Sequence, residues 1–158
     1  MIGNIKIIAV CMCKVYDERN YRIIRALNNF AVENDYRLFV YHTCSDLYWK
    51  TLSEKGEQSV FDLIDYNITD AVVTFEEGVY AENVMTKIRM DAAKYGKPVI
   101  SVGVEHDDCI SIKFGYAKGF EQVVRHVIEQ HGVRDIGFIA GRKDEENSEE
   151  RIAVFRKL

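Results

Sequence analysis

The sequence predicts an α/β fold in which a mostly parallel, doubly wound sheet of six strands carries helices on both faces. Apolar runs of strand length alternate with amphipathic segments of helix length along the chain, and strands separated by helical crossovers pair in parallel. The first apolar run, IKIIAVCMC over 5–13, lacks polar alternation, as expected of a strand covered on both faces. We expect residues 1–158 to form one such lobe.

The first half of the chain predicts three strands and two helices. After the strand at 5–13, apolar residues recur at helical spacing over 18–34, which predicts an amphipathic helix. The run YRLFVYH over 36–42 predicts the second strand, and an apolar stripe at helical spacing predicts a helix over 51–66. The run DAVVTF over 70–75 predicts the third strand.

The next elements are separated by clear stop signals. A helix is predicted over 81–95, and Gly96-Lys-Pro98 then provides the glycine-then-proline pattern that ends helices. Strands are predicted over 99–103 and 109–114. The link between them, 105–108, is too short for a helix, so these two strands must be joined differently from the others.

The end of the chain predicts a helix over 117–130, a sixth strand over 136–140 and a last helix. Asn147 and Glu150 have the spacing of a capping box at the start of that helix. No glycine, asparagine or proline ends it before Leu158. We therefore expect the chain to be part of a larger, two-lobe ligand-binding domain.

The composition excludes some classes of protein. Hydrophobic residues make up 47% and charged residues 29% of the chain, with a single proline, as in soluble globular proteins. The net charge of −4 gives no support for a nucleic-acid-binding surface. The apolar run at 5–13 has no cleavage site of a signal peptide, and no stretch is long enough to cross a membrane. We expect a cytoplasmic protein without membrane contact.

The four cysteines fall in or just after the predicted strands and are interpreted as buried, inert thiols of a reduced protein. Cys11 and Cys13 lie on the same face of one strand, where they are poorly placed to bond each other. A zinc site would need a close pair of cysteines or histidines, and the spacing of the four histidines offers none. We predict neither a metal nor a cofactor.

The carboxyl ends of the strands, where doubly wound sheets bind ligands, are polar and aromatic here. The glycine-rich turn of a nucleotide site is missing after the first strand, where the sequence is CKVYD over 13–17. No Ser-His-Asp or Cys-His set is apparent, so no catalytic residues are assigned. The pattern favours a small polar ligand, such as a sugar or a nucleoside, over a nucleotide.

Several residues near these ends also have a plain structural interpretation. Asp17 can simply cap the helix that follows it. Tyr16 is harder to place in a core and is a candidate stacking group. Tyr48 and Trp49 are interpreted as an apolar anchor for the 43–53 loop.

Two charged positions remain open in the same way. Glu76 and Glu77 follow the third strand and have the composition of a solvated turn. Arg151 lies one turn into the last helix, where its guanidinium can either grip a ligand bidentately or form a surface salt bridge. Position alone favours neither role for Arg151.

Two motifs resemble a known family. The segment IGFIAG over 136–141 followed by RIAVF over 151–155 is similar to a pattern of the effector-binding domain of LacI/GalR-type regulators, which has the type 1 periplasmic-binding-protein fold. Gly119-Phe120 and the HVIE run from His126 match a helix of the same family. The resemblance covers essentially the whole chain. It implies two lobes that close around a ligand, and a homodimer formed through outer helices.

The resemblance also implies roles for particular residues. It places Arg151 at the family's ligand-contacting arginine, residues 16–21 at its first ligand loop, and Asn147 in its last. The family's Asp-Asn pair after the fifth strand is replaced by Phe114-Gly115, so the ligand's identity does not carry over. The candidate ligand-binding residues are Tyr16, Asp17, Asn20, Tyr21, Ser45, Glu76, Phe114, Asn147 and Arg151.

The sequence thus predicts a non-catalytic sensor of a small polar molecule that controls an attached output. An extra residue at His131-Gly132 and the polar run before Arg151 look more like sensor modules of diguanylate cyclase (GGDEF) proteins. If Met1 is the natural start, no helix-turn-helix precedes the lobe; otherwise a LacI-type repressor, contacting DNA through a separate domain, stays open. A flavodoxin-like or Rossmann-like enzyme and a lobe that has lost its ligand stay open as well.

Overall fold

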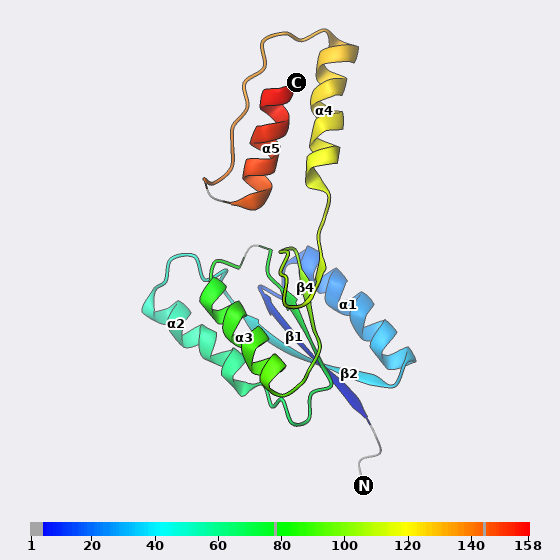
Figure 1. Cartoon of the computed structure of the whole chain (residues 1–158), viewed down its shortest axis with the longest axis vertical. Coiled ribbons are helices and arrows are strands. Elements are labelled where there is room, and N and C mark those ends of the chain that lie inside the picture. Colours follow the sequence, from blue (N-terminus) through cyan, green and yellow to red (C-terminus); the bar gives the residue numbers. More distant parts are fainter. Residues whose placement is uncertain (1–4, 78, 144) are drawn as a thin grey trace. The chain divides into compact units, whose positions relative to one another are not determined.

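A computed structural model describes residues 5–77, 79–143 and 145–158. The contacts of the chain divide it into two compact units, Met1–Lys113 and Phe114–Leu158. The sequence predicts one lobe over the whole chain, whereas these two units each have their own packing. We describe each unit separately (Figure 1).

The first unit contains a parallel five-stranded sheet with the strand order β2-β1-β3-β4-β5. Three helices and a 3-10 turn, η1, connect the strands. The strands are β1 Lys6–Cys13, β2 Tyr36–Thr43, β3 Ala71–Phe75, β4 Val99–Val102 and β5 Ile110–Ile112. The helical segments are α1 Glu18–Glu33, α2 Leu52–Gln58, η1 Ser59–Leu63 and α3 Glu82–Lys94. The predicted doubly wound α/β fold is confirmed, with α1 on one side of the sheet and α2 and α3 on the other (Figure 1).

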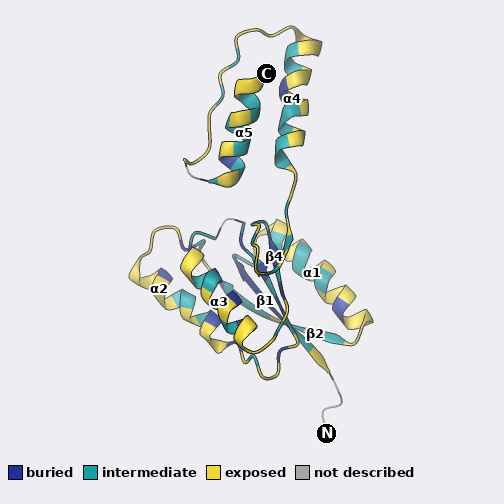
Figure 2. Ribbon diagram, in the orientation of Figure 1, coloured by how far each residue is buried: buried dark blue, intermediate teal, exposed yellow. Residues whose placement is uncertain are grey.

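The central strand β1 is buried on both faces, as its uninterrupted apolar sequence predicts. Ala9, Cys11 and Cys13 belong to the main core, which includes residues of η1, β3, α3 and the β2–α2 loop. Val10 and Met12, whose side chains alternate with these, are also buried. Figure 2 shows buried residues concentrated along this strand, whereas α1 exposes much of its surface.

The predicted helix over 51–66 is shorter and ends in a tighter turn. α2 stops at Gln58 and continues as the 3-10 turn η1. Its start is a true capping box, in which the Thr51 hydroxyl accepts from the Glu54 amide and the Glu54 carboxylate accepts from the Thr51 amide.

The link between β4 and β5 is short, and the two strands nevertheless pair in parallel. A short link is sufficient here because both strands are short. Gly103 follows β4 with a φ of +102°, and a Cβ at this position would lie 2.5 Å from Cβ of Glu77. Only glycine combines this backbone conformation with such close approach. The Gly103 amide then donates to the Ile112 carbonyl at 2.8 Å, which holds the link against the end of β5.

The second unit is a pair of helices, α4 Tyr116–His131 and α5 Glu146–Lys157, with an extended connection between them. The rings of Phe120 and Phe155 each lie 5.0 Å from the ring of Phe138, which comes from that connection. This aromatic stack is the centre of the unit.

The prediction of a sixth strand over 136–140 is wrong for the described residues, in which this segment pairs with no strand. A strand is stabilised by a ladder of hydrogen bonds to a neighbour, and the described part of the second unit supplies no such neighbour. Ile139 is 96% exposed as a result, although Phe138 beside it packs inward.

The predicted capping box at the start of the last helix is also wrong. The N-cap residue is Glu145, so Asn147 already lies inside α5. Ser148 bonds back to Glu145 through both its amide and its hydroxyl. A Cβ on Gly141 would lie 2.1 Å from the Ser148 hydroxyl, so the chain before the helix packs directly on its first turn. Among the described helices, none combines the length and apolar character that a membrane span requires.

Candidate functional site

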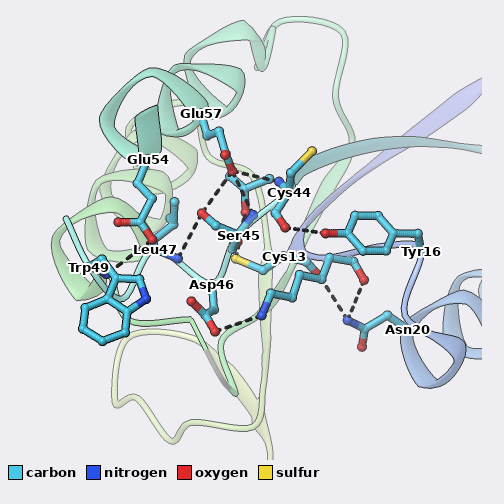
Figure 3. Close-up of polar contacts among 12 residues, drawn as sticks. Cys13, Tyr16, Asn20, Cys44, Ser45, Asp46, Leu47, Trp49, Glu54 and Glu57 are labelled. Carbon is cyan, nitrogen blue, oxygen red and sulfur yellow. Dashed lines mark hydrogen bonds and ion pairs between the residues drawn. The ribbon is translucent and has the colours of Figure 1, made fainter. Parts of the chain in front are cut away.

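The loops that follow β1 and β2 meet at the carboxyl edge of the sheet and form a polar cluster (Figure 3). β1 and β2 are neighbours in parallel register, with Cys13 paired to Thr43. Their carboxyl ends therefore lie side by side. In open α/β sheets this edge is where ligands bind.

The β1–α1 loop is fixed by Asn20. Its side-chain amide donates to the carbonyl of Cys13 at 3.0 Å and to that of Lys14 at 3.1 Å. Lys14 has a positive φ of 49°, a conformation that is unfavourable for a non-glycine residue. The amide of Lys14 also donates to the Thr43 carbonyl at 2.8 Å. Asn20, predicted as a ligand contact, thus holds the turn in a strained shape.

The other candidates in this loop have accessible side chains. Tyr16 is 61% exposed, and its hydroxyl donates to the carbonyl of Cys44 in the neighbouring loop. Tyr21 is 58% exposed. Asp17 occupies the N-cap position of α1 but makes no side-chain capping bond, so the interpretation of its carboxylate as a cap is wrong. Tyr16, Asp17 and Tyr21 therefore present two aromatic rings and a carboxylate at the edge.

At the start of the β2–α2 loop, two successive backbone amides donate to a carboxylate that comes from α2. One oxygen of Glu57 accepts from the amides of Cys44 and Ser45, both at 2.9 Å, and from the Ser45 hydroxyl at 3.1 Å. Ser45, another predicted ligand residue, is thus used to attach the loop to α2. Figure 3 shows Glu57 reaching from α2 to both residues.

The anchor of the same loop is Leu47 rather than Trp49. Leu47 is fully buried with a φ of 62°. Trp49 is 76% exposed, so the interpretation of Trp49 as an anchor is wrong; its ring meets that of Tyr48 edge to face at 4.7 Å. The Trp49 amide donates to the buried carboxylate of Glu54 at 3.3 Å. Glu54, which completes the capping box of α2, therefore also fixes the backbone from which the indole projects.

One ion pair connects the two loops. The Lys14 ammonium lies 2.9 Å from the Asp46 carboxylate, and both side chains are about one-third exposed. Partial burial opposes ionisation of Asp46, but the hydrogen bond and the charge of Lys14 together lower the pKa of Asp46 below its usual value. The same hydrogen bond raises the pKa of Lys14. Both groups are therefore charged at neutral pH.

Glu76, at the end of β3, is buried rather than solvated, contrary to the turn interpretation. Its carboxylate accepts from the guanidinium of Arg89 at 2.9 Å and from the Thr74 hydroxyl at 2.8 Å. Nε2 of His106 lies 2.9 Å from it, and the Ser101 hydroxyl lies at 3.3 Å.

This network joins β3, β4, α3 and the β4–β5 link below the carboxyl edge. All the contacts of Glu76 named above are with other residues of the chain, which favours a positioning role over direct contact with a ligand. Sequence spacing could not reveal it, because Arg89 and His106 lie in other elements. Glu77, its neighbour, pairs with Arg19 at 2.7 Å.

Three candidates lie in the second unit. Phe114 is 39% exposed, and its ring lies 5.8 Å from that of Tyr116. Arg151 is partly buried in α5, and its Nε donates to the backbone carbonyl of Asn147 at 2.8 Å. Ligand contact by Phe114, Asn147 and Arg151 stays a prediction.

Three of the four thiols have pKa values above the usual range. Burial raises the pKa of Cys13 to about 11, and it raises the pKa of Cys11 and Cys109 as well. Cys44 is exposed and Cys109 is only partly buried, which corrects the expectation that all four cysteines are buried. No group of three or more His, Cys, Asp or Glu side chains within 5–77, 79–143 and 145–158 could hold a metal ion.

The chain resembles solved structures of ligand-binding proteins. The lac repressor dimer bound to operator and the anti-inducer ONPF is 14% identical, with a TM-score of 0.65, over 99% of this chain and 44% of its own. A periplasmic binding protein/LacI transcriptional regulator from Alkaliphilus metalliredigens QYMF, complexed with D-xylulofuranose, is 18% identical, with a TM-score of 0.66, over 96% and 51%. A solute-binding protein of an ABC transporter from Burkholderia multivorans is 12% identical, with a TM-score of 0.66, over 98% and 56%.

No protein-family model matches the sequence, and no curated protein matches it. The similarities therefore concern the fold. The chain has a periplasmic-binding-protein-like fold of the kind found in LacI-type regulators, and it spans about half the length of these solved structures.

Proposed function

We propose that this chain is part of the effector-binding domain of a LacI-type regulator or sensor, and that it binds a small polar molecule such as a sugar. The carboxyl edge of β1 and β2 carries this proposal. Tyr16, Asp17 and Tyr21 are accessible there, and the loops that carry them are fixed by bonds within the chain. Aromatic rings and a carboxylate suit the apolar faces and hydroxyl groups of a sugar.

The comparisons support the same class of ligand. The regulator from Alkaliphilus metalliredigens holds D-xylulofuranose, and a regulator from Enterococcus faecalis with 14% identity is described as sugar-binding. These neighbours are regulators and binding proteins rather than enzymes. The raised pKa values of the buried thiols also argue against nucleophilic catalysis at this edge. We infer a binding function without catalysis for this segment.

The division into two units suggests how the domain is organised. The first unit has a covered sheet of its own, whereas the 136–140 segment of the second unit leaves Ile139 almost fully exposed. We infer that the first unit is one lobe and that the second unit belongs to the other lobe. Arg151 and Asn147 would then belong to that lobe.

Two outputs are open. Control of transcription through a separate DNA-binding domain has the support of the neighbours, since several are transcriptional regulators. A diguanylate cyclase output rests on the sequence around His131 and Asn147 alone, and none of the proteins named above is a cyclase. We therefore favour the regulator, acting as a cytoplasmic homodimer in which ligand closure shifts a two-state equilibrium.

The binding proposal can be tested with the natural protein that contains this chain. Trp49 is the only tryptophan of this chain. Any tryptophan elsewhere in the natural protein would be replaced by phenylalanine, so that the fluorescence emission of Trp49 reports on this edge. A panel of pentoses, hexoses and nucleosides would be titrated by fluorescence and calorimetry. Tyr16→Ala and Arg151→Ala should each weaken binding of a hit by about tenfold or more, or ~1.4 kcal/mol. Arg156→Ala, on the same helix, is the matched control for Arg151.

Two results would contradict the proposal. Unchanged affinity in both variants would place the ligand elsewhere. No binding across the panel would favour a lobe that has lost its ligand, a possibility that the replacement by Phe114-Gly115 keeps open. Operator binding or synthesis of cyclic diguanylate by the same protein would separate the two outputs.

A further inference from the structure

Two histidine side chains meet at the carboxyl end of α4. The Nε2 atoms of His126 and His131 lie 3.1 Å apart, and the rings stand edge to face, with centroids 4.9 Å apart and planes at 77°. Both residues are exposed. The function proposed above uses neither of them, so the pair calls for its own explanation.

The distance fixes what can lie between the two nitrogens. Two lone pairs cannot face each other at 3.1 Å, so one nitrogen must carry a proton that the other accepts. A metal cation can take the place of that proton, because neutral imidazole binds metals through the same lone pair. Each ring would then keep its proton on Nδ1.

The geometry fits two ligands on one metal ion. With metal–nitrogen bonds of about 2.0–2.1 Å, a nitrogen separation of 3.1 Å corresponds to a ligand–metal–ligand angle of about 95–102°. This angle lies between the values for octahedral and tetrahedral coordination. The metal would lie off the line that joins the two nitrogens, so each ring would turn by about 40° from the hydrogen-bonded arrangement to aim its lone pair at the ion.

The surroundings also favour a cation. Gly132 follows α4 with a φ of 65°, and its amide donates to the Ile128 carbonyl at 3.1 Å, so the last turn is fixed. The negative end of the helix dipole lies in this turn. The nearest basic residue along the chain, Arg125, is paired with Glu121 at 2.9 Å and with Glu129 at 3.5 Å, which reduces its repulsion of a bound ion.

We propose that His126 and His131 form a two-imidazole site for a divalent late transition metal such as Zn²⁺, Ni²⁺ or Cu²⁺. Imidazole is a preferred ligand of these ions. Because the described residues contain no larger group of metal-binding side chains, water would complete the coordination and the metal would exchange readily. The sequence did not reveal this pair, because the two histidines are five residues apart, whereas side chains on one helical face recur every three or four residues.

The site can be tested by titrating Zn²⁺ into the untagged chain by calorimetry. A Cys44→Ser background removes the exposed thiol, which is a competing zinc ligand. We expect one bound ion, and we expect His126→Gln and His131→Gln each to weaken binding by at least the ~10-fold that loss of a supporting residue costs a metal site. His42→Gln is the control, because His42 lies in β2, where its Nδ1 contacts the Thr43 carbonyl at 3.3 Å.

A second measurement distinguishes a metal site from a simple hydrogen bond. Nitrogen NMR of the histidine rings should show opposite tautomers in the free chain, and the Nδ1–H form for both His126 and His131 in the presence of Zn²⁺. Circular dichroism would establish that the variants are folded. Equal zinc affinity in both variants and the parent, or unchanged tautomers at saturating zinc, would overturn the proposal.

Discussion

Removing either member of the Glu76–Arg89 pair should destabilise the protein far more than removing both. Both side chains are 7% exposed, and the guanidinium contacts both carboxylate oxygens at 2.9 Å. Loss of one partner leaves the other charge buried with only its weaker contacts, Asp108 at 3.7 Å from Arg89 or His106 at 2.9 Å from Glu76, and breaking a buried pair typically costs about 3–5 kcal/mol. We expect this loss for Arg89→Met and for Glu76→Leu.

The double variant provides the sharper test. With both charges gone, the Thr74 hydroxyl and Nε2 of His106, which lie 2.8 and 2.9 Å from Glu76 in the native protein, lose their partner. The imidazole is only partly buried, so the main residual cost is the hydroxyl, and an unsatisfied buried hydroxyl costs about 1–3 kcal/mol. The Ser101 hydroxyl keeps its bond to the Val104 carbonyl at 2.9 Å. The double variant should therefore be more stable than either single variant.

Urea unfolding followed by circular dichroism measures this cycle. The free energies of unfolding of the parent, the two single variants and the double variant are compared at equal m-values, so that changes in midpoint report stability. Glu76→Gln, which keeps an oxygen for Thr74, separates the loss of charge from the loss of a hydrogen-bond acceptor. Effects of Glu76→Leu and Arg89→Met that add within about 0.5 kcal/mol would refute a coupled buried pair.

Four further predictions concern the carboxyl edge. Leu47→Ala should cost about 2–5 kcal/mol of unfolding free energy and Trp49→Ala almost nothing, since only Leu47 is buried; equal losses in urea unfolding would argue against this assignment. Exposed Cys44 should react with a maleimide before Cys13 does. Because burial raises the pKa of Cys13 from 9.0 to about 11, its contribution to stability is intact below pH 9 and is lost as the pH rises toward 11, which unfolding of the parent and of Cys13→Ala over that range would measure. Asp46→Asn should cost only about 0–1 kcal/mol, as for exposed ion pairs; a loss above about 2 kcal/mol would mean that the pair holds the two loops together.

The sheet of the first unit could be predicted because its strands have clear sequence patterns. The apolar run over 5–13 is buried on both faces as expected, and Gly96-Lys-Pro98 ends α3 at the predicted place. The sixth strand failed for a reason outside its own sequence. The run IGFIA is typical of a strand, but a strand also needs a neighbour, and the described part of the second unit contains none.

The meeting of the loops after β1 and β2 at one edge was predictable, but the contacts of their side chains were less so. The carboxyl ends of parallel strands always meet at one edge, which is why Tyr16 and Ser45 could be placed near each other. The partners of such residues could not be predicted, since Glu57 reaches Ser45 from twelve residues away and Arg89 reaches Glu76 from α3. Such contacts depend on how helices pack on the sheet, which local patterns do not determine.

The carboxylate of Glu57 has a consequence for how a ligand would be recognised. By accepting from the amides of Cys44 and Ser45, it gives the β2–α2 loop a fixed shape before any ligand arrives. A loop that is already ordered loses little conformational entropy on binding, so more of the contact energy remains as affinity. Selectivity for one ligand over another would then depend on the side chains at this edge, because the backbone that carries them keeps the same conformation. Substitutions at a few accessible positions could change the preferred ligand while the fold stays intact.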